Sequence, residues 1–211
     1  MIIDIHTHQI PVRKGTALIS LSLEKPEIIE DHYYSAGIHP WSVNGNMGPE
    51  LDQLAELLLL PSVLAVGEAG MDSLVAGNTD WQENVLLAQI EMSESLNKPM
   101  ILHVVREIDK VISLRKRVLP RCGWLIHGFR GNGVEAARLR KLGFSLSFGT
   151  LHNRSALLET PLSEMFLETD TEVDIVKLYN YVSLLKKTPP ATLIGEVSNN
   201  IKRFLDTSFV R

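Results

Sequence analysis

Short apolar runs alternate along the chain with longer stretches in which apolar residues recur at helical spacing. Eight runs have the length of buried strands, and they cover residues 2–5, 17–23, 33–37, 63–67, 100–104, 123–126, 145–148 and 165–168. Helices are predicted at 49–60, 80–96, 108–119, 133–142, 155–158, 173–187 and 191–205. Strands that alternate with helices pair in parallel, so eight of them predict a closed TIM (β/α)₈ barrel in the α/β class. An open doubly wound sheet is the alternative.

The connection between the first two predicted strands is too short for a regular barrel. Residues 9–16 contain Pro11 and Gly15 and number fewer than the dozen or more of a usual parallel crossover. The chain of 211 residues is also shorter than the roughly 250 of a typical barrel. We therefore expect a shortened barrel with a missing or irregular first helix, which leaves the place of the second strand open. No linker or repeat interrupts the pattern, so we expect a single domain over residues 1–211.

The composition indicates a chain that folds around its own core. Hydrophobic residues make up 45% and charged residues 22% of the sequence, which contains a single cysteine, Cys122. A chain of this length needs no disulfide or structural metal to fold, so a bound metal would serve chemistry. The N-terminus lacks the pattern of a signal peptide. The longest apolar run, at residues 57–66, is about half the ~20 residues of a membrane span. We expect a cytoplasmic protein that does not enter the membrane.

Charge is distributed unevenly along the sequence. Residues 103–141 contain ten Lys or Arg and three Asp or Glu, a net +7, so the rest of a chain of net charge −4 carries −11. A basic face suits a phosphate-containing substrate. The alternative is that these residues form the solvated faces of two amphipathic helices.

The first predicted strand leads into a cluster of polar residues, Asp4-Ile5-His6-Thr7-His8. Alternate residues of a strand point to the same side, so we expect Asp4, His6 and His8 to converge. Two imidazoles in this arrangement can bind one divalent cation. The alternative is a pair of solvated histidines at the end of a strand.

Further residues of the metal-binding types lie at the ends of later strands: Glu68, His103, His127 and Asp170. In a barrel these strand ends surround one mouth, where active sites form. Six ligands exceed the number that one tetrahedral zinc uses, so we expect two metals that share a bridging carboxylate, best supplied by Glu68. The alternatives are a Glu68 that accepts backbone N–H bonds and core histidines that each make one hydrogen bond.

Eight segments, in order along nearly the whole chain, carry a family resemblance. They are Asp4–His8, Gly37–Pro40, Gly67–Asp72, Lys98–His103, His127–Gly131, Leu142–Gly149, Glu168–Asp170 and Asn199–Phe204. With them the sequence resembles the TatD family of metal-dependent hydrolases (the TatD DNase family), a branch of the amidohydrolase-like barrel enzymes. The resemblance implies a two-metal site that hydrolyses phosphodiester bonds, in DNA for the characterised branch.

The resemblance also implies a role for each site residue. The residues are His6 and His8 on one metal, Glu68 as the catalytic bridge, His103 and His127 on the other metal, Asp170 as ligand and base, and Asp4 and Asp72 as groups that orient the ligands. We expect two divalent ions, with zinc, manganese and magnesium as candidates. Histidine with carboxylate suits zinc, manganese, iron or nickel better than magnesium.

The sequence departs from the family pattern where substrate would bind. Valine occupies the position at which the family usually has an arginine after its histidine ligand, and the arginine is Arg106. Arg130 stands near His127, and His39 precedes Pro40, so we take His39, Arg106 and Arg130 as candidate substrate contacts. The usual proline after Asp170 and its loop are replaced by residues 171–174, whose acids would repel a nucleic-acid backbone. Hydrolysis is thus better supported than DNA as the substrate.

Three functions remain open at this point. The first is a two-metal phosphodiester hydrolase, a TatD-like deoxyribonuclease, in which a metal-bound hydroxide attacks phosphorus and Asp170 takes the proton. The second is a hydrolase of a small-molecule ester, amide or phosphomonoester. The third is a metal-binding protein that has lost turnover. The expected partner is DNA or another phosphoester, and the chain is expected to be a monomer or a small homo-oligomer. The sequence leaves open DNA against RNA and exonuclease against endonuclease.

Overall fold

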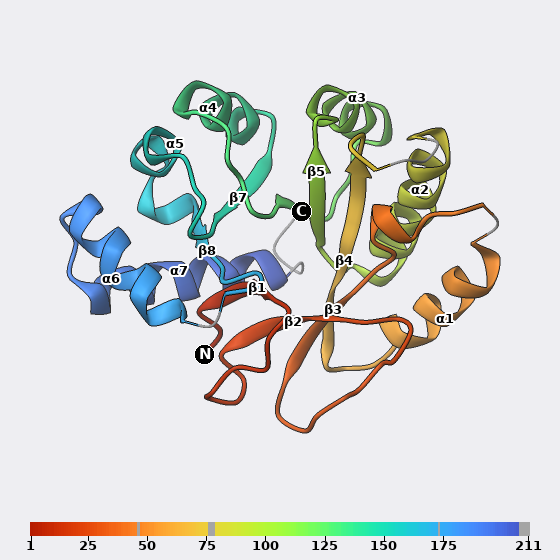
Figure 1. Cartoon of the computed structure of the whole chain (residues 1–211), viewed down its shortest axis with the longest axis horizontal. Helices are drawn as coiled ribbons and strands as arrows, with labels where there is room; N and C mark the ends of the chain where they lie inside the picture. The colour runs from red at the N-terminus through yellow and green to blue at the C-terminus, as the bar shows by residue number, and fades with distance from the viewer. Residues whose placement is uncertain (46, 76–78, 173, 207–211) are drawn as a thin grey trace.

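Eight parallel strands form the centre of the computed structural model, which describes residues 1–45, 47–75, 79–172 and 174–206 (Figure 1). The strands follow one another around the sheet in chain order. They are β1 (Asp4–Thr7), β2 (Ala17–Leu21), β3 (Tyr33–Ala36), β4 (Val63–Asp72), β5 (Met100–Val105), β6 (Trp124–Ile126), β7 (Phe144–Phe148) and β8 (Met165–Leu167). Each strand lies within a predicted apolar run or overlaps one. The agreement arises because almost every position in the strands is buried.

The last strand meets the first, so the sheet curls into a nearly closed barrel. Thr7 forms an isolated parallel bridge with Asp170, just beyond the end of β8. The Asp170 N–H donates to the His6 carbonyl at 3.0 Å, and the His8 N–H donates to the Asp170 carbonyl at 2.8 Å. The predicted barrel is confirmed, and the open doubly wound sheet is wrong.

Helices cover the outside of the barrel from β3 onward (Figure 1). They are α1 (Gly48–Leu58), α2 (Thr79–Leu96), α3 (Ile108–Val118), α4 (Gly133–Lys141), α5 (Arg154–Glu159), α6 (Ile175–Lys186) and α7 (Pro190–Leu205), with short 3₁₀ turns η1 (Pro40–Ser42) and η2 (Leu162–Glu164). The predicted helices are confirmed to within about two residues; Val173, where one was predicted to start, is outside the described residues. Among the described helices, none is both long and apolar enough to cross a membrane.

Two connections of the barrel contain no helix: residues 8–16 between β1 and β2, and residues 22–32 between β2 and β3. No helix was predicted in either segment, since the first predicted helix begins at residue 49. A four-residue strand such as β1 spans about 13 Å, and nine extended residues reach about 30 Å, so a short crossover can return the chain without a helix. The structure places β2 between β1 and β3, parallel to both.

The longest strand, β4, contains a bulge at the position of Glu68. Val66 pairs with Met100 and Ala69 with Leu102, so three steps along β4 match two along β5. Such an extra residue bends a strand and re-aims its side chains. Gly67 and Gly70 permit the bulge with φ angles of 153° and 150°, which other residues rarely adopt. The predicted strand ended at residue 67, because these glycines resemble a turn in the sequence.

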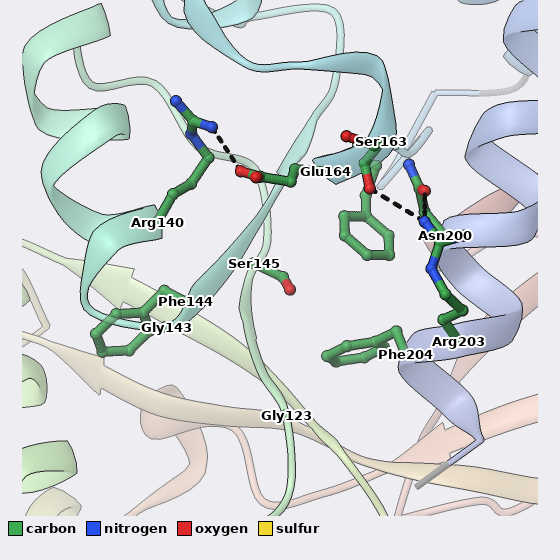
Figure 2. A pocket seen from close by; sticks show the side chains of 11 residues that line it. Gly123, Arg140, Gly143, Phe144, Ser145, Ser163, Glu164, Asn200, Arg203 and Phe204 are labelled. Carbon is green, nitrogen blue, oxygen red and sulfur yellow. Dashed lines mark hydrogen bonds and ion pairs between the residues drawn. The ribbon is translucent and has the colours of Figure 1, made fainter. Parts of the chain in front are cut away.

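Helix α7 packs against the end of the barrel where the strands begin. The Asn200 side-chain amide donates to the carbonyls of Leu162 and Met165 at 2.7 and 2.8 Å, which anchors the helix beside β8. A cavity of about 380 Å³ remains between α7 and the starts of β6, β7 and β8 (Figure 2). Its two arginines are both engaged: Arg140 pairs with Glu164 at 2.5 Å, and Arg203 donates to the Ser163 carbonyl at 3.1 Å.

Part of the basic segment at residues 103–141 is paired with neighbouring carboxylates. The ion pairs are Arg117–Glu83, Arg121–Glu94, Arg138–Asp109, Arg140–Glu164 and Lys110–Glu107. Half of the ten basic side chains are therefore paired on the outside of the barrel. This supports the interpretation of solvated helix faces over that of a basic phosphate-binding face.

We predict that Gly70→Ala will lower the free energy of unfolding by about 3 kcal/mol or more. A Cβ at this position would lie 1.9 Å from the His103 carbonyl oxygen, so the bulge could not form unchanged. Urea unfolding measures the effect. Gly195→Ala is the matched control, because a Cβ there meets nothing within 4 Å in helix α7 and should add about 1 kcal/mol. A Gly70→Ala protein as stable as the parent would contradict the bulged geometry.

Candidate metal centre

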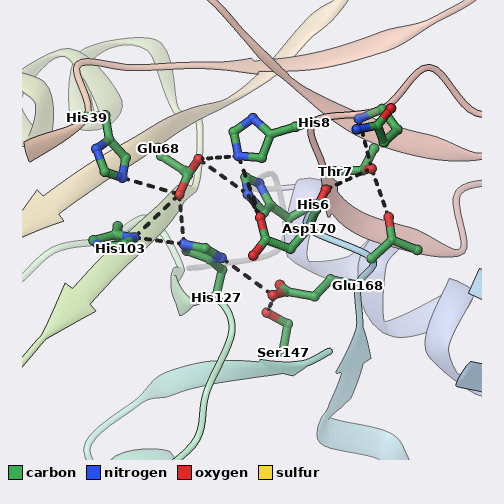
Figure 3. A network of polar contacts seen from close by, with 12 residues as sticks. His6, Thr7, His8, His39, Glu68, His103, His127, Ser147, Glu168 and Asp170 are labelled. Carbon is green, nitrogen blue, oxygen red and sulfur yellow. Dashed lines mark hydrogen bonds and ion pairs between the residues drawn. The ribbon is translucent and has the colours of Figure 1, made fainter. Parts of the chain in front are cut away.

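Glu68 lies at the centre of a cluster of histidines at the mouth where the strands end (Figure 3). Its side chain is 6% exposed, and its Oε2 lies 2.9 Å from Nε2 of His8 and 3.4 Å from Nε2 of His6. Oδ1 of Asp170 lies 3.6 and 3.9 Å from the same two nitrogens. His6 ends up beside Asp170 because the hydrogen bonds that close the barrel join their backbones.

The other oxygen of Glu68 faces a second group of histidines. Oε1 lies 2.8 Å from Nε2 of His127, 3.6 Å from Nδ1 of His103 and 3.6 Å from Nε2 of His39. Nδ1 of His103 and Nε2 of His127 are 3.3 Å apart. One carboxylate thus has a group of imidazoles at each oxygen, which is the geometry that a bridge between two cations requires.

Glu168 is a site residue that the sequence analysis did not single out. Its side chain is 0% exposed, and its Oε1 lies 3.4 Å from Nδ1 of His127. The Ser147 hydroxyl donates to Oε2 at 2.5 Å, which fixes the carboxylate. At this distance the two atoms form an ion pair and no hydrogen bond among the described residues, and the negative charge of Glu168 favours a protonated or metal-bound His127 ring. A charged residue directly after the buried run Met-Phe-Leu of β8 was the signal in the sequence.

Asp72 holds His103 from the other side of the cluster. Its Oδ2 lies 3.2 Å from Nε2 of His103 and accepts a hydrogen bond from Nε1 of Trp41 at 2.7 Å. Oδ1 accepts from the Leu74 N–H at 2.8 Å. Trp41 is 62% exposed as a residue and lines the cavity at the mouth.

Asp4 does not converge with the ring of either histidine, contrary to the expectation from strand alternation. Its carboxylate accepts hydrogen bonds from the Thr169 N–H at 3.1 Å, the Thr169 hydroxyl at 2.7 Å and the His6 N–H at 3.3 Å. A buried carboxylate takes the nearest donors, and here they lie across the closing seam of the barrel. Burial raises the pKa of Asp4 to about 7, although these hydrogen bonds oppose the shift. Asp4 thus contacts the cluster only through backbone.

Two glutamines of α2 fix the backbone beside the cluster. The Gln89 side chain accepts from the Ile38 N–H at 2.7 Å and donates to the Ile38 carbonyl at 3.2 Å, next to His39. Gln82 makes the same pair of bonds with the backbone of Asp72, at 2.9 and 3.1 Å. Both glutamines are buried. Each clamps one peptide group, so the loops that carry His39 and Asp72 have a defined position.

A cavity of about 880 Å³ opens over the cluster. Its wall includes His8, His39, Glu68, Trp41, His103, His127 and Asp170. The two other candidate substrate contacts, Arg106 and Arg130, are exposed and do not line it. Of the three candidates, the structure therefore brings only His39 to the cluster.

The ionisable groups of the cluster shift one another's pKa values. Burial alone would raise the pKa of Glu68, but hydrogen bonds with the surrounding imidazoles outweigh it and hold that pKa far below its usual range. Burial opposes charge on His127 as well, yet Glu168 and Glu68 raise its pKa to about 10. Burial lowers the pKa of His39 to about 4. The carboxylates therefore favour positive charge among the imidazoles, and a divalent cation supplies such charge while it displaces protons.

The residues present fit a divalent metal. The His6 side chain is 0% exposed, and neither of its ring nitrogens makes a hydrogen bond within the part of the chain that the structure describes. Burying a polar nitrogen without a partner lowers the stability of the fold. A metal ion bound to His6 would remove this cost. Two sets of ligand atoms lie within 4.8 Å of one another, His6–His8–Glu68 and His39–Glu68–His103. Imidazole nitrogen with carboxylate oxygen is a donor set for zinc, manganese, iron or nickel.

The chain is similar in fold to two solved structures. A TatD homologue from Escherichia coli K12, YJJV, matches with a TM-score of 0.76 and 24% identity over 90% of this chain and 86% of that one. A TatD family hydrolase from Entamoeba histolytica matches with a TM-score of 0.76 and 14% identity over 92% and 85%.

Two curated relatives are similar in sequence. The "Uncharacterized metal-dependent hydrolase YcfH" of Escherichia coli K12 is 31% identical over 147 residues, 65% of this chain and 55% of the relative. The "3'-5' ssDNA/RNA exonuclease TatD" of a Rahnella strain is 28% identical over 168 residues, 71% of this chain and 62% of the relative. The matched part thus spans less than two thirds of these relatives. The description of the matching family is TatD related DNase, and its model covers residues 7–206, so the chain belongs to this family.

Proposed function

We propose that this protein is a hydrolase of phosphodiester bonds that depends on two divalent metal ions. The observation that carries the proposal is the carboxylate of Glu68, which has separate groups of histidines at its two oxygens. A relative named as an ssDNA/RNA exonuclease and relatives named as metal-dependent hydrolases support the same chemistry. Nucleic acid or a smaller phosphoester is the substrate class. A single domain, residues 1–211, carries the activity.

In this proposal each metal has its own ligands. His6 and His8 would hold one ion, His103 and His127 would hold the other with His39 close by, and Glu68 would contribute one oxygen toward each group. Asp170 adds a carboxylate on the side of His6 and His8. When bound, such a pair of ions holds the oxygens of a phosphodiester and lowers the pKa of bound water.

The residues of the chain position the substrate and move the proton. Asp170 is 33% exposed and lines the cavity, so its carboxylate can accept the proton of the attacking water at a free Oδ. Glu168 and Asp72 hold the rings of His127 and His103 in place. The leaving oxygen can take up the proton that Asp170 received, which restores the carboxylate for the next turnover.

We predict that Mn²⁺ or Zn²⁺ will stabilise the protein and that Glu68→Gln will lose most of this effect. A ligand at a hundred times its Kd adds about 2.7 kcal/mol to the free energy of unfolding, and Glu68 is the residue that contacts both groups of histidines. Thermal unfolding with and without the metal measures it. Glu56→Gln, an exposed residue of α1, is the control and should respond as the parent does. A parent protein that no divalent ion stabilises would refute the metal site.

We also predict metal-dependent hydrolysis of bis(p-nitrophenyl) phosphate that EDTA abolishes. Asp170→Asn should lower kcat by roughly 10²–10⁴-fold, because it removes the proton acceptor. Release of p-nitrophenol measures the rate. Glu172→Gln, at the same mouth and exposed, should leave kcat within about twofold. Hydrolysis that persists in EDTA, or in Asp170→Asn at the parent rate, would be incompatible with the proposed reaction.

Glu168 provides a separate test of how the site is held. Glu168→Gln should weaken metal binding about 10–100-fold, as losing the carboxylate behind a ligand histidine does. Titration of Mn²⁺ followed by calorimetry gives the affinity. Glu164→Gln, a half-exposed residue near the other end of β8, serves as the control. Equal metal affinity in Glu168→Gln and the parent would mean that Glu168 does not position His127.

A further inference from the structure

The cavity over the cluster extends well beyond the histidines, toward the segment after β2 and the start of α1. Its far wall includes Ser22 and Glu24 from that segment and Glu50 and Gln53 from α1. The Gln53 side-chain amide donates to the Leu23 carbonyl at 2.8 Å, which holds the two walls together. A volume of about 880 Å³ is within the usual range for a small-molecule site. The cluster therefore has room beside it for one substituent of a phosphoester.

The charges on this cavity are unusual for a site that accepts a phosphate. Among the described residues that line it, none is a lysine or an arginine, and Glu24 and Glu50 lie on its far wall. Oε2 of Glu50 makes no hydrogen bond in the described part of the chain. Glu50 is half-buried and Glu24 is exposed, so Glu50 repels an anion more strongly than Glu24, whose charge is screened by water and salt. A second phosphate away from the cluster would meet the carboxylates of Glu24 and Glu50 and no cationic side chain among the described lining residues.

An aromatic face lies at the mouth of the same cavity. The bond from Nε1 of Trp41 to Asp72 fixes the indole, which also makes edge contacts with the rings of His39 and His103, while the residue as a whole is 62% exposed. A held and exposed aromatic ring is a platform on which a planar ring can stack. The cavity thus combines a stacking surface with polar walls that bear no cationic side chain.

We propose that the cavity receives a nucleoside that bears no further phosphate, while the scissile phosphate lies at the cluster. The proposal rests on the proposed function, since it assigns the substituent of that phosphoester. Glu24 and Glu50 reject a second phosphate, and the Trp41 ring stacks on the base. Such a nucleoside can be the end of a strand or part of a small phosphodiester.

The first experiment compares three dinucleotides with the Mn²⁺-loaded protein: TpT, pTpT with an added 5'-phosphate, and TpTp with an added 3'-phosphate. We expect kcat/KM for at least one phosphorylated dinucleotide to be about tenfold or more below that of TpT. In the double variant Glu24→Gln/Glu50→Gln, kcat/KM for the phosphorylated dinucleotide should lie within about threefold of that for TpT. Glu27→Gln/Glu56→Gln removes the same charge from the same two segments outside the cavity and should retain the parent's selectivity. Equal kcat/KM for all three dinucleotides in the parent would overturn the proposal.

The second experiment measures binding, so that it does not depend on turnover. By calorimetry we expect the Mn²⁺-loaded protein to bind thymidine 5'-monophosphate about fivefold or more tightly than thymidine 3',5'-bisphosphate or 2-deoxyribose 5-phosphate. The Glu24→Gln/Glu50→Gln variant should bind the mono- and bisphosphate nearly equally. If the parent protein bound all three compounds with equal affinity, the assignment of the cavity to a nucleoside would be overturned even if the enzyme is active. Selective binding without hydrolysis of any dinucleotide would refute the proposed function and leave the assignment standing.

Discussion

The buried carboxylate of Glu68 is the constraint on which the rest of the site depends. Removing a carboxylate from water costs several kcal/mol unless opposite charge and hydrogen-bond donors replace the water. The imidazoles from β1, β5 and β6 supply those donors, and they can do so only if β4 bends enough to point Glu68 into the mouth. The bulge and the two glycines beside it make this bend possible. The bulge in β4 is therefore needed to place Glu68 among the imidazoles, and the imidazoles are needed to stabilise the buried carboxylate.

Barrel closure and the site depend on the same hydrogen bonds. Asp170 pairs through its backbone with His6 and His8, and Asp4 ties the preceding residue, Thr169, to β1. A change that loosened this seam would both open the barrel and move Asp170 away from the histidines. The missing helices lie on the same side of the barrel, after β1 and β2, and the segment after β2 forms a wall of the cavity instead. The two connections without helices thus lie beside the cluster, and the residues of the cluster itself are all present.

Much of the fold was predictable from the sequence, because each strand is a run of buried apolar residues bounded by helices with clear periodicity. The mouth residues were predictable for a related reason: polar residues at the ends of apolar strands converge in a barrel. Asp4 contacts the cluster through the His6 N–H and Thr169 and not through a histidine ring. Strand alternation does not reveal which donors lie across a seam. Glu168 was not found because its partners, His127 and Ser147, come from other strands. The bulge in β4 depends on how closely the backbone of β5 approaches Gly67 and Gly70. The distance between two strands cannot be read from the sequence of one of them.

The described cavity wall contains no lysine or arginine. In the proposed site, bound metal ions would therefore provide most of the attraction for a negatively charged substrate. In the proposed reaction the positive charge that attracts a phosphoester would come from ions held by histidines and carboxylates, since none of the basic residues of α3 and α4 lines the described cavity and four of the seven are paired with carboxylates. A substrate that contacts both ions also holds them in place, and binding free energies coupled in this way act equally in both directions. Metal and substrate should therefore each strengthen the binding of the other. A substitution at one ligand then weakens both, because the cavity has no cationic side chain to attract the phosphate in place of a lost ion.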